Sequence, residues 1–318
     1  MKNSTLSVED LKVQFSRRRE VARAVDGVNL DIAAGEVVAL VGESGCGKTT
    51  LARTMMGLEM PKSGEVRFNG SPLGRRAMRE YRRKVQMVFQ DPSGALNPRD
   101  TIYEAVAEGL RVHKVAGDEV AQVAAALSKC GLRPPERFFN RYPHEVSGGQ
   151  RQRVVIAAAM VLEPQMLIAD EPVASLDASV RGEILKLLRD LVDQHGLGML
   201  VITHDLGLAW NIADRIAVMY LGRIVEIGSC EEILEHPKHP YTQALLSVVP
   251  ESKRMEQQIL TGETPDPLHI PKGCRFHPRC PLMQNGEADR LGIADRCRGA
   301  DIGLRDVGQG TRVACHAI

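Results

Sequence analysis

The 318-residue sequence predicts an α/β fold, in which short buried strands are each followed by a turn and a helix. Three apolar runs of strand length carry this prediction, at residues 36–41, 166–171 and 200–205. The first run passes directly into a glycine-rich turn and then into a good helical stretch. Apolar runs of this length, bounded by turn residues and alternating with helices, are typical of α/β proteins.

Composition places the chain among ordinary globular proteins. Hydrophobic residues make up 43% and charged residues 25%, and the net charge is +1, so nothing favours nucleic acid as a partner. No apolar run approaches the ~20 residues that span a bilayer. The first ten residues lack the apolar centre of a signal peptide. We therefore expect a cytosolic protein that can still dock on a membrane protein, with one large domain and an appendage or with two domains.

Residues 42–49 match the pattern G-x-x-x-x-G-K-[ST] of a phosphate-binding loop, between a strand and a helix as this motif requires. Glycines let the backbone approach phosphates, and the N–H groups of the loop and helix face the anion. Lys48 is expected to reach the β- and γ-phosphates, and the Thr49 hydroxyl to hold Mg²⁺. The predicted nucleotide-binding residues here are Gly42, Glu43, Ser44, Gly45, Cys46, Gly47, Lys48, Thr49 and Thr50.

Polar residues end three further strands. Asp170 and Glu171 close the second run; Asp170 is predicted to bind Mg²⁺, and Glu171 to orient or deprotonate the attacking water. His204, one strand further on, is predicted to contact the γ-phosphate, and Gln90 to touch Mg²⁺ or the water. Solvated acids and a structural histidine are the alternatives, and the phosphate loop upstream makes both less favourable.

A second glycine-rich turn, Ser147-Gly148-Gly149-Gln150, opens another helix about a hundred residues after the first. With these motifs in order, the chain resembles the ATP-binding subunits of ABC transporters. Its six matching elements are Walker A (42–49), the Q-loop Gln90, the signature (146–150), Walker B (166–171), the D-loop (175–177) and the switch His204. Val146 replaces the usual leucine of the signature, a mild departure.

The resemblance implies that ATP lies between the Walker A of one subunit and the signature of another. Ser147, Gly148, Gly149 and Gln150 would then act on the partner's nucleotide, together with Asp177 of the D-loop. The positive end of the signature helix suits a γ-phosphate. The nucleotide would join two subunits, and its hydrolysis would let them separate.

The resemblance also implies an architecture. Residues 1–235 would form a RecA-like ATPase core, with an antiparallel β-subdomain from the first strands and a helical signature subdomain at about 92–154. Residues 236–318 would form a small C-terminal extension. Phe15 is the candidate for stacking on the adenine, and a core position in the first strand is its alternative.

Three stretches resemble the oligopeptide and dipeptide importer group, at residues 89–99, 142–145 and 239–242. This implies an ATP-hydrolysing subunit that powers import of di- and oligopeptides from the cytoplasmic face of the inner membrane. The implied partners are a second, related ATPase chain in a heterodimer, two membrane permease subunits and an extracytoplasmic substrate-binding protein. A homodimer is chemically possible, because every catalytic element is present.

Other functions stay open at this stage. The same branch of the family serves nickel and oligosaccharides. A soluble ABC ATPase is the second alternative, but such chains usually carry two cassettes or a long coiled-coil insertion, and neither is visible here. An exporter ATPase is the third, and the C-terminal extension argues against it.

Four cysteines follow residue 273 with the spacing C-x5-C-x16-C-x17-C: Cys274, Cys280, Cys297 and Cys315. Structural zinc sites usually contain a C-x2–4-C pair, which this spacing lacks. Four thiolates in one small segment can hold an iron–sulfur cluster, and some members of the peptide-importer group carry a [4Fe–4S] cluster on cysteines placed like these. A structural [4Fe–4S] cluster is therefore the prediction, with zinc or free buried thiols as alternatives.

Cys46 lies inside the phosphate loop, near the start of a helix. A helix N-terminus stabilises a thiolate, so we expect a lowered pKa for Cys46. The resulting hypothesis is that alkylating agents block ATP binding through this thiol. Cys130 and Cys230 are expected to be packed thiols.

Overall fold

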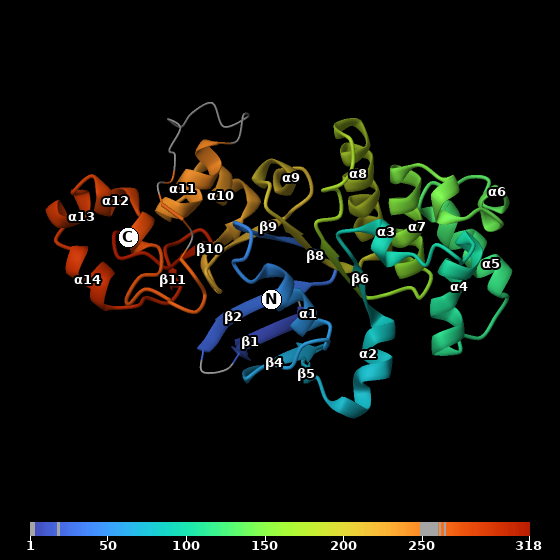
Figure 1. Ribbon diagram of the computed structural model, residues 1–318, viewed down its shortest axis with the longest axis horizontal. Helices are drawn as coiled ribbons and strands as arrows, with labels where there is room; N and C mark the ends of the chain where they lie inside the picture. The colour runs from blue at the N-terminus through green and yellow to red at the C-terminus, as the bar shows by residue number, and fades with distance from the viewer. Residues whose placement is uncertain (1–3, 18–19, 249–259, 261, 264) are drawn as a thin grey trace. The chain divides into compact units, whose positions relative to one another are not determined.

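The computed structural model describes residues 4–17, 20–248, 260, 262–263 and 265–318 (Figure 1). The chain divides into two compact units. Unit 1 comprises Met1–Ser7, Asp31–Val37 and Arg67–Ile202, and unit 2 comprises Val8–Leu30, Val38–Val66 and Thr203–Ile318. The predicted phosphate loop therefore belongs to unit 2, and the predicted signature belongs to unit 1.

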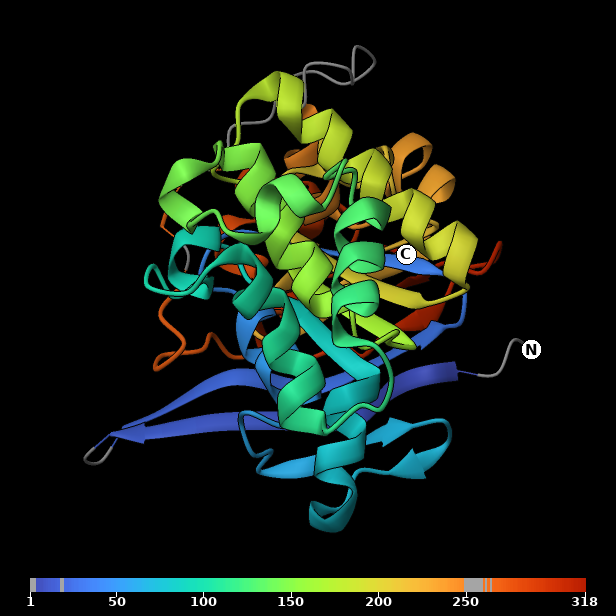
Figure 2. The same cartoon turned by 90° about the vertical axis from the view of Figure 1, so that its right-hand side faces the viewer.

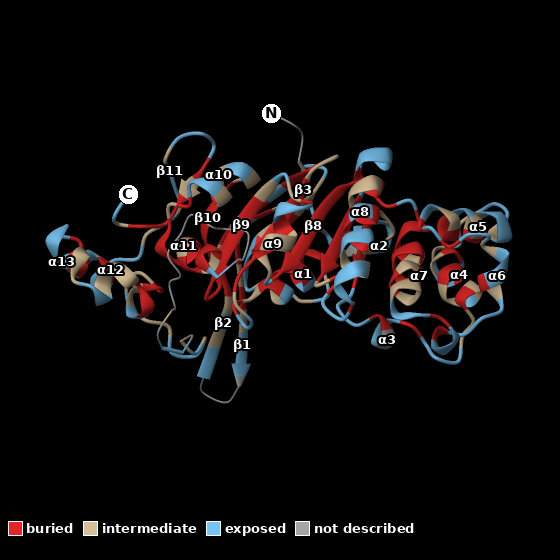
Figure 3. Ribbon diagram, turned by 90° about the horizontal axis from the view of Figure 1, so that it is seen from above, coloured by how far each residue is buried: buried red, intermediate tan, exposed pale blue. Residues whose placement is uncertain are grey.

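Unit 1 contains three parallel strands in the order β8-β7-β6. Their bounds are β6 (Val85–Val88), β7 (Met166–Asp170) and β8 (Gly198–Thr203, whose last residue is assigned to unit 2). Every residue of β7 and β8 is buried, as the red strand β8 in Figure 3 shows. Burial on both faces explains why these strands read as continuous apolar runs.

In unit 1, every element between β6 and β7 is a helix, in a span that is described without gaps. These elements are α3 (Pro92–Ala95), α4 (Ile102–His113), α5 (Glu119–Lys129), α6 (Glu136–Phe139), η2 (Pro143–Glu145) and α7 (Gly148–Met160). Helices α4, α5 and α7 pack against one another and are drawn in green side by side in Figure 2. Local signals start them: Thr101 and Glu104 form a capping box at α4, and Asp118 caps α5.

The remaining elements of unit 1 lie on either side of this helical stretch. The hairpin of β4 (Ser63–Phe68, which begins in unit 2) and β5 (Ser71–Pro72) is antiparallel. It is followed by η1 (Arg75–Ala77) and α2 (Met78–Lys84). After β7, helix α8 (Ala178–His195) ends at Gly196, which adopts φ 64° and so closes the helix in the left-handed conformation.

In unit 2, five of the described strands are hydrogen-bonded in the order β11-β12-β10-β9-β3. Their bounds are β3 (Val37–Val41), β9 (Arg215–Tyr220), β10 (Arg223–Ser229), β11 (Arg305–Asp306) and β12 (Arg312–Val313). Strand β3 runs parallel to β9, and the other pairs are antiparallel. The long strands β1 (Ser4–Arg17) and β2 (Glu20–Ala33) lie largely in unit 2 and belong to a separate sheet, in the order β2-β1-β4-β5.

The C-terminal residues of unit 2 share a core with the strand that precedes the phosphate loop. Tyr241, Phe276 and Cys280 pack in one buried cluster with Val41 of β3 and Val218 of β9. The helices of this unit are α1 (Lys48–Met55), α9 (Leu206–Trp210), α10 (Cys230–Glu235), α11 (Pro240–Ser247), η3 (His277–Arg279), α12 (Pro281–Gln284), α13 (Glu287–Arg290) and α14 (Ala294–Gly299). Residues on both sides of position 235 thus contribute to one core, while the domain boundary proposed there stays a prediction.

The predicted α/β class is confirmed, since parallel strands alternate with helices and the first strands belong to a separate sheet. The signature lies in the all-helical stretch, as predicted. Within the described part of the chain, none of the helices has the length and apolar character needed to cross a membrane.

Candidate functional site

The phosphate loop of unit 2 is built so that glycine is required at two positions. Gly47 adopts φ 107°, and a Cβ there would lie 2.1 Å from the carbonyl oxygen of Ala24. A Cβ on Gly42 would lie 2.2 Å from the carbonyl oxygen of Met219 in β9. Real Cβ atoms never approach a backbone oxygen so closely, so the loop packs against the backbone of its own unit in a way that no other residue permits.

Lys48 is the first residue of α1, and its side chain turns back onto the loop. Its ammonium donates to the carbonyl oxygens of Gly42 at 2.7 Å and Glu43 at 2.9 Å, and the residue is only 7% exposed. Gly47 occupies the N-cap position of α1, where no side chain caps the helix. The first-turn N–H groups of α1 are thereby left for an anion, at the positive end of the helix.

The expected lowered pKa of Cys46 is wrong. The thiol is 1% exposed, and burial raises its pKa, while the neighbouring ammonium of Lys48, 3.9 Å from the sulfur, acts in the opposite direction. Desolvation of the thiolate therefore outweighs the positive end of the helix. Burial likewise raises the pKa of Cys130 to about 12 and that of Cys230 to about 11, as suits packed thiols.

Glu43 of the loop is held by two residues that sequence reasoning did not single out. Its backbone N–H donates to the hydroxyl oxygen of Tyr241 at 2.9 Å. Its carboxylate accepts two hydrogen bonds from the guanidinium of Arg279, at 2.7 and 3.0 Å. These contacts span 198 and 236 residues of sequence, and the only signal was that Tyr241 lies inside the stretch 239–242 already linked to the peptide-importer group.

In unit 1, the two predicted Walker B acids follow one another at the end of β7. Asp170 is the last residue of the strand and is 4% exposed. Glu171 adopts a left-handed φ of 47°, and its N–H donates to the carbonyl oxygen of Ile202 at 2.9 Å. A glutamate in this conformation costs about 1–3 kcal/mol, and such strain tends to be kept where it aims a functional side chain.

Gln90 and Asp170 lie at the carboxyl ends of two neighbouring strands of unit 1. Strands β6 and β7 are parallel and adjacent, with Val88 opposite Ala169, so both chains emerge at their carboxyl ends. Gln90 is exposed there. The carboxyl edge of parallel strands is where α/β proteins place their ligands. His204 is exposed and belongs to unit 2, directly after the end of β8.

The predicted signature turn caps its own helix. The Ser147 hydroxyl accepts from the N–H of Gln150 at 3.2 Å, and the Gln150 side chain accepts from the N–H of Ser147 at 3.1 Å. This reciprocal capping box starts α7. A Cβ on Gly149 would lie 2.6 Å from Val180 of α8, whereas Ser147 and Gly148 are exposed and can be reached by another molecule.

Two further predicted residues are also exposed. Asp177 of the D-loop occupies the N-cap position of α8 but makes no side-chain cap bond there. Phe15 lies in β1 with 45% of its surface exposed, so the alternative of a core phenylalanine is not what the structure shows. An exposed ring of this size is available for stacking on a planar ligand.

The four C-terminal cysteines line one small cavity. Burial raises the pKa of Cys274 to about 12 and of Cys280 to about 11, and the pKa values of Cys297 and Cys315 rise for the same reason. The charges of the other three thiolates also raise the pKa of Cys274. Across the described residues, no three His, Cys, Asp or Glu side chains converge closely enough for a single metal ion.

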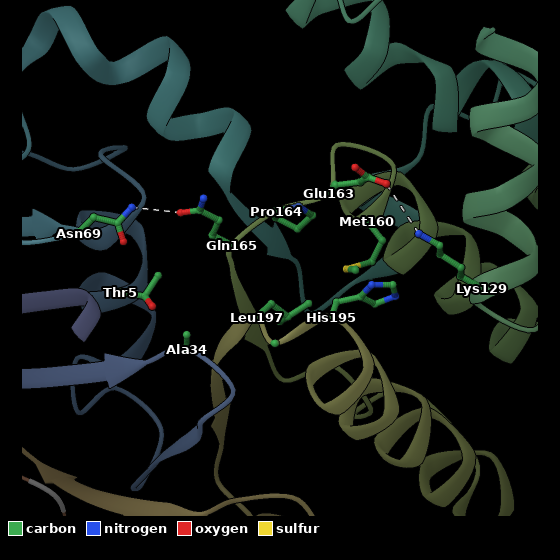
Figure 4. Close-up of a pocket in the computed structure, with 11 residues that line it drawn as sticks. Thr5, Ala34, Asn69, Lys129, Met160, Glu163, Pro164, Gln165, His195 and Leu197 are labelled. Atoms are coloured by element: carbon green, nitrogen blue, oxygen red, sulfur yellow. Dashed lines mark hydrogen bonds and ion pairs between the residues drawn. The ribbon is translucent and has the colours of Figure 1, made fainter. Parts of the chain in front are cut away.

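Figure 4 shows a separate pocket in unit 1. Its lining includes Asn69, which donates to Gln165 at 3.1 Å, and Glu163, which pairs with Lys129 at 3.9 Å. None of the residues predicted to bind nucleotide lines it. It lacks a glycine-rich loop, so we do not assign the nucleotide to this pocket.

Two family models match separate parts of the chain. The family model of ABC transporters matches residues 25–174, and the model of the oligopeptide/dipeptide transporter C-terminal region matches residues 225–286. The oligopeptide transport ATP-binding protein OppF of Salmonella typhimurium is 44% identical over 87% of this chain and 88% of its own length. The oligopeptide transport ATP-binding protein AppF of Bacillus subtilis is 42% identical over 85% of each chain.

Solved structures resemble the fold over a shorter span. The cbiO1 protein of Clostridium perfringens, part of the ABC transporter complex cbiONQ, matches with a TM-score of 0.67 and 31% identity over 74% of this chain and 92% of its own. A dimeric ATP-binding cassette in a post-hydrolysis state, bound to ADP and Pi, matches with a TM-score of 0.64 and 30% identity over 71% and 98%. The chain therefore belongs to the ABC transporter family, and within it to the ATP-binding proteins of the oligopeptide/dipeptide transporter group.

Proposed function

We propose that the chain binds and hydrolyses ATP to power the import of di- and oligopeptides. The observation that carries this proposal is the combination of an ABC ATPase segment with a C-terminal region matched by the oligopeptide/dipeptide transporter model. The relatives named above are oligopeptide transport ATP-binding proteins. Import of nickel or oligosaccharides by the same kind of system is the second candidate, because the cargo is chosen by other subunits.

The nucleotide chemistry is assigned to the residues of the predicted motifs. The loop residues 42–50 hold the phosphates, with Lys48 on the β- and γ-phosphates, and Phe15 stacks on the adenine. Thr49, Gln90 and Asp170 supply the oxygen ligands that Mg²⁺ prefers. Glu171 polarises the attacking water, and the left-handed backbone that aims it supports this role. His204 contacts the γ-phosphate and keeps the water in line.

The exposed signature acts on the nucleotide of a second subunit. Ser147 and Gly148 are open to another molecule, Gln150 holds the turn in shape, and Asp177 of the D-loop faces the neighbour. The dimeric arrangement of one solved relative supports an assembly of two cassettes. We propose a related but different ATPase chain as the second subunit, with two membrane permeases and an extracytoplasmic substrate-binding protein, at the cytoplasmic face of the inner membrane.

We assign a [4Fe–4S] cluster to Cys274, Cys280, Cys297 and Cys315. All four thiols face one mostly apolar cavity. Four thiolates from one small segment are the ligand set that a [4Fe–4S] cluster takes. A cluster binds thiolates, so its loading would release the protons of these thiols. The cluster would cross-link the C-terminal segment, which is too short to form a large apolar core of its own.

Peptide uptake by cells tests the transport proposal. Glu171→Gln should bind ATP but lower turnover by about 10²–10⁴-fold, so uptake of labelled di- and oligopeptides should fall to background. Glu163→Gln is the matched control, because Glu163 also has a left-handed φ (49°) and is exposed but lines the pocket of Figure 4. If peptide uptake persists with an ATPase-dead chain, the peptide cargo is wrong, and nickel and oligosaccharides become the substrates to assay.

Metal analysis tests the cluster. Chain purified without oxygen should contain about four iron and four sulfide per molecule and show the broad visible absorption of an iron–sulfur chromophore. Cys297→Ser should lose both, whereas Cys130→Ser, which alters a buried thiol outside the cavity, should keep them. Zinc in place of iron, or thiols that all react with a thiol reagent after unfolding without metal release, would overturn the assignment.

A further inference from the structure

Glu43 of the phosphate loop forms hydrogen bonds with three other residues through its N–H, its carboxylate and its carbonyl oxygen. The N–H of Glu43 donates to Tyr241, and its carboxylate accepts two bonds from Arg279. Its carbonyl oxygen accepts from the ammonium of Lys48 at 2.9 Å. Glu43 thus joins the C-terminal region, on one side, to the lysine expected to bind phosphate, on the other.

Tyr241 and Arg279, the two C-terminal side chains that bind Glu43, are both buried. Tyr241 is fully buried, and its ring lies 4.7 Å from that of Tyr220 and 5.3 Å from that of Phe276. Arg279 is 6% exposed and ends the short helix η3, next to Cys280. Buried side chains on packed elements lose little freedom when they bind, so they can fix the position of a loop.

The geometry of the ion pair makes it more than a surface contact. Two parallel bonds from Arg279 orient the carboxylate of Glu43 as well as neutralise it. The side chains are 7% and 27% exposed, so solvent and salt screen this pair less than an exposed one. Without Arg279, a negative charge would remain beside a site that must accept a polyphosphate, and it would repel the ligand.

We infer that Arg279 and Tyr241 are positioning residues of the phosphate-binding loop, which act through Glu43 to set the affinity of the chain for ATP. This inference rests on the proposed function, because it concerns nucleotide held by residues 42–50. We infer that the C-terminal region contributes to the ATP site through Glu43, without direct contact with the nucleotide or Mg²⁺. The contacts run Tyr241 or Arg279 to Glu43, and Glu43 to Lys48.

Binding of a fluorescent ATP analogue to the full-length chain in Mg²⁺, with displacement by ATP, measures the effect. Arg279→Ala should weaken affinity about tenfold, and Tyr241→Phe, which keeps the packed ring but removes the acceptor for the Glu43 N–H, about threefold. In steady-state hydrolysis, the KM for ATP should rise more than kcat falls, because the loop is misplaced before the chemical step.

A rescue variant separates positioning from general support of the fold. Glu43→Gln added to Arg279→Ala removes the unpaired charge, so most of the lost affinity should return; a purely structural role for Arg279 would give no such recovery. Arg305→Ala is the matched control. Arg305 also lies in the C-terminal region, but it donates to the carbonyl oxygens of Cys315 and Ile318, both at 2.6 Å, and not to the carboxylate of Glu43.

The outcomes separate this inference from the function on which it rests. If the unaltered chain does not bind ATP, the proposed function itself fails. If it binds ATP, and Arg279→Ala and Tyr241→Phe bind equally well, only the positioning role fails. That role also fails if Arg305→Ala loses as much affinity as Arg279→Ala, or if Glu43→Gln restores nothing.

Discussion

The chain has two glycine-rich turns that open a helix, and they are built in opposite ways. The turn at 42–49 has no side-chain cap, and two of its glycines, Gly42 and Gly47, lie directly against the backbone of distant strands. The turn at 147–150 caps itself with Ser147 and Gln150. The first depends on contacts from far along the chain, including Tyr241, whereas the second depends on its own four residues and one packing contact.

This difference teaches what each turn is prepared for. A helix whose first N–H groups lack a side-chain acceptor is ready for an anion bound by the same unit. A helix that satisfies its own first turn is stable while its face is exposed to solvent. We interpret the first turn as the site for the chain's own nucleotide, and the second as a surface that waits for the nucleotide of a partner.

The largest difference between the two turns is expected in stability, when one glycine of each turn is replaced by alanine. Gly47→Ala should lower the free energy of unfolding by about 3 kcal/mol or more, because its Cβ collides with a backbone oxygen at a positive φ. Gly148→Ala should change it by no more than about 1 kcal/mol, since its Cβ would find Leu176 at an ordinary 3.8 Å and helix propensity favours alanine. Urea unfolding measures both, and similar values would contradict the contrast.

The second prediction separates binding from turnover. Lys48→Ala should weaken ATP binding by the isolated chain about a hundredfold, because it removes a buried charge from the loop. Ser147→Ala should leave this affinity within about twofold, since we propose that the signature acts on another subunit's nucleotide. Equilibrium binding at low protein concentration tests the pair, and an equal loss in both variants would show that the two turns share one nucleotide.

The third prediction concerns the capping box of the signature helix. Ser147→Ala should cost about 1 kcal/mol of stability, the usual value for a lost N-cap. Ser147→Asp should restore the stability, because a carboxylate also caps a helix, but it should not restore ATP turnover, because its charge repels a γ-phosphate. Thermal unfolding and hydrolysis assays on the same samples measure the two effects. Recovery of both would mean that the serine serves the helix alone.

The smallest effect is expected at Cys46. Burial raises the pKa of this thiol above its ordinary value, so its thiolate is scarce at pH 8 and alkylation should be several-fold slower in the folded chain than after unfolding in urea. Because the folded pKa is the higher one, the linked stability is present below the unfolded pKa, near 8.5, and is lost as pH rises through the folded value. Site-resolved mass spectrometry measures labelling, and faster labelling of the folded chain would contradict this.

Local motifs explain how much of the site was predictable. The phosphate loop, the capping residue Ser147 and the acids after β7 depend on short-range geometry, and the structure places them at a helix start, a helix cap and a strand end. The pKa of Cys46 was predicted in the wrong direction, because the helix start is visible in sequence and burial by distant segments is not. The exposure of Phe15 could not be told from its residue type.

The sequence by itself determined the α/β class, the order of the motifs and the family, because strand periodicity, glycine-rich turns and helix caps are encoded within a few residues. Only the tertiary structure decided that Arg279 binds the carboxylate of Glu43, 236 positions away in sequence. It also decided that four cysteines, which are well separated in sequence, line one cavity. Such contacts arise when separate elements bury their apolar faces in a common core, here the cluster that joins β3 to Tyr241 and Phe276. No local pattern specifies which distant polar groups that packing will bring together.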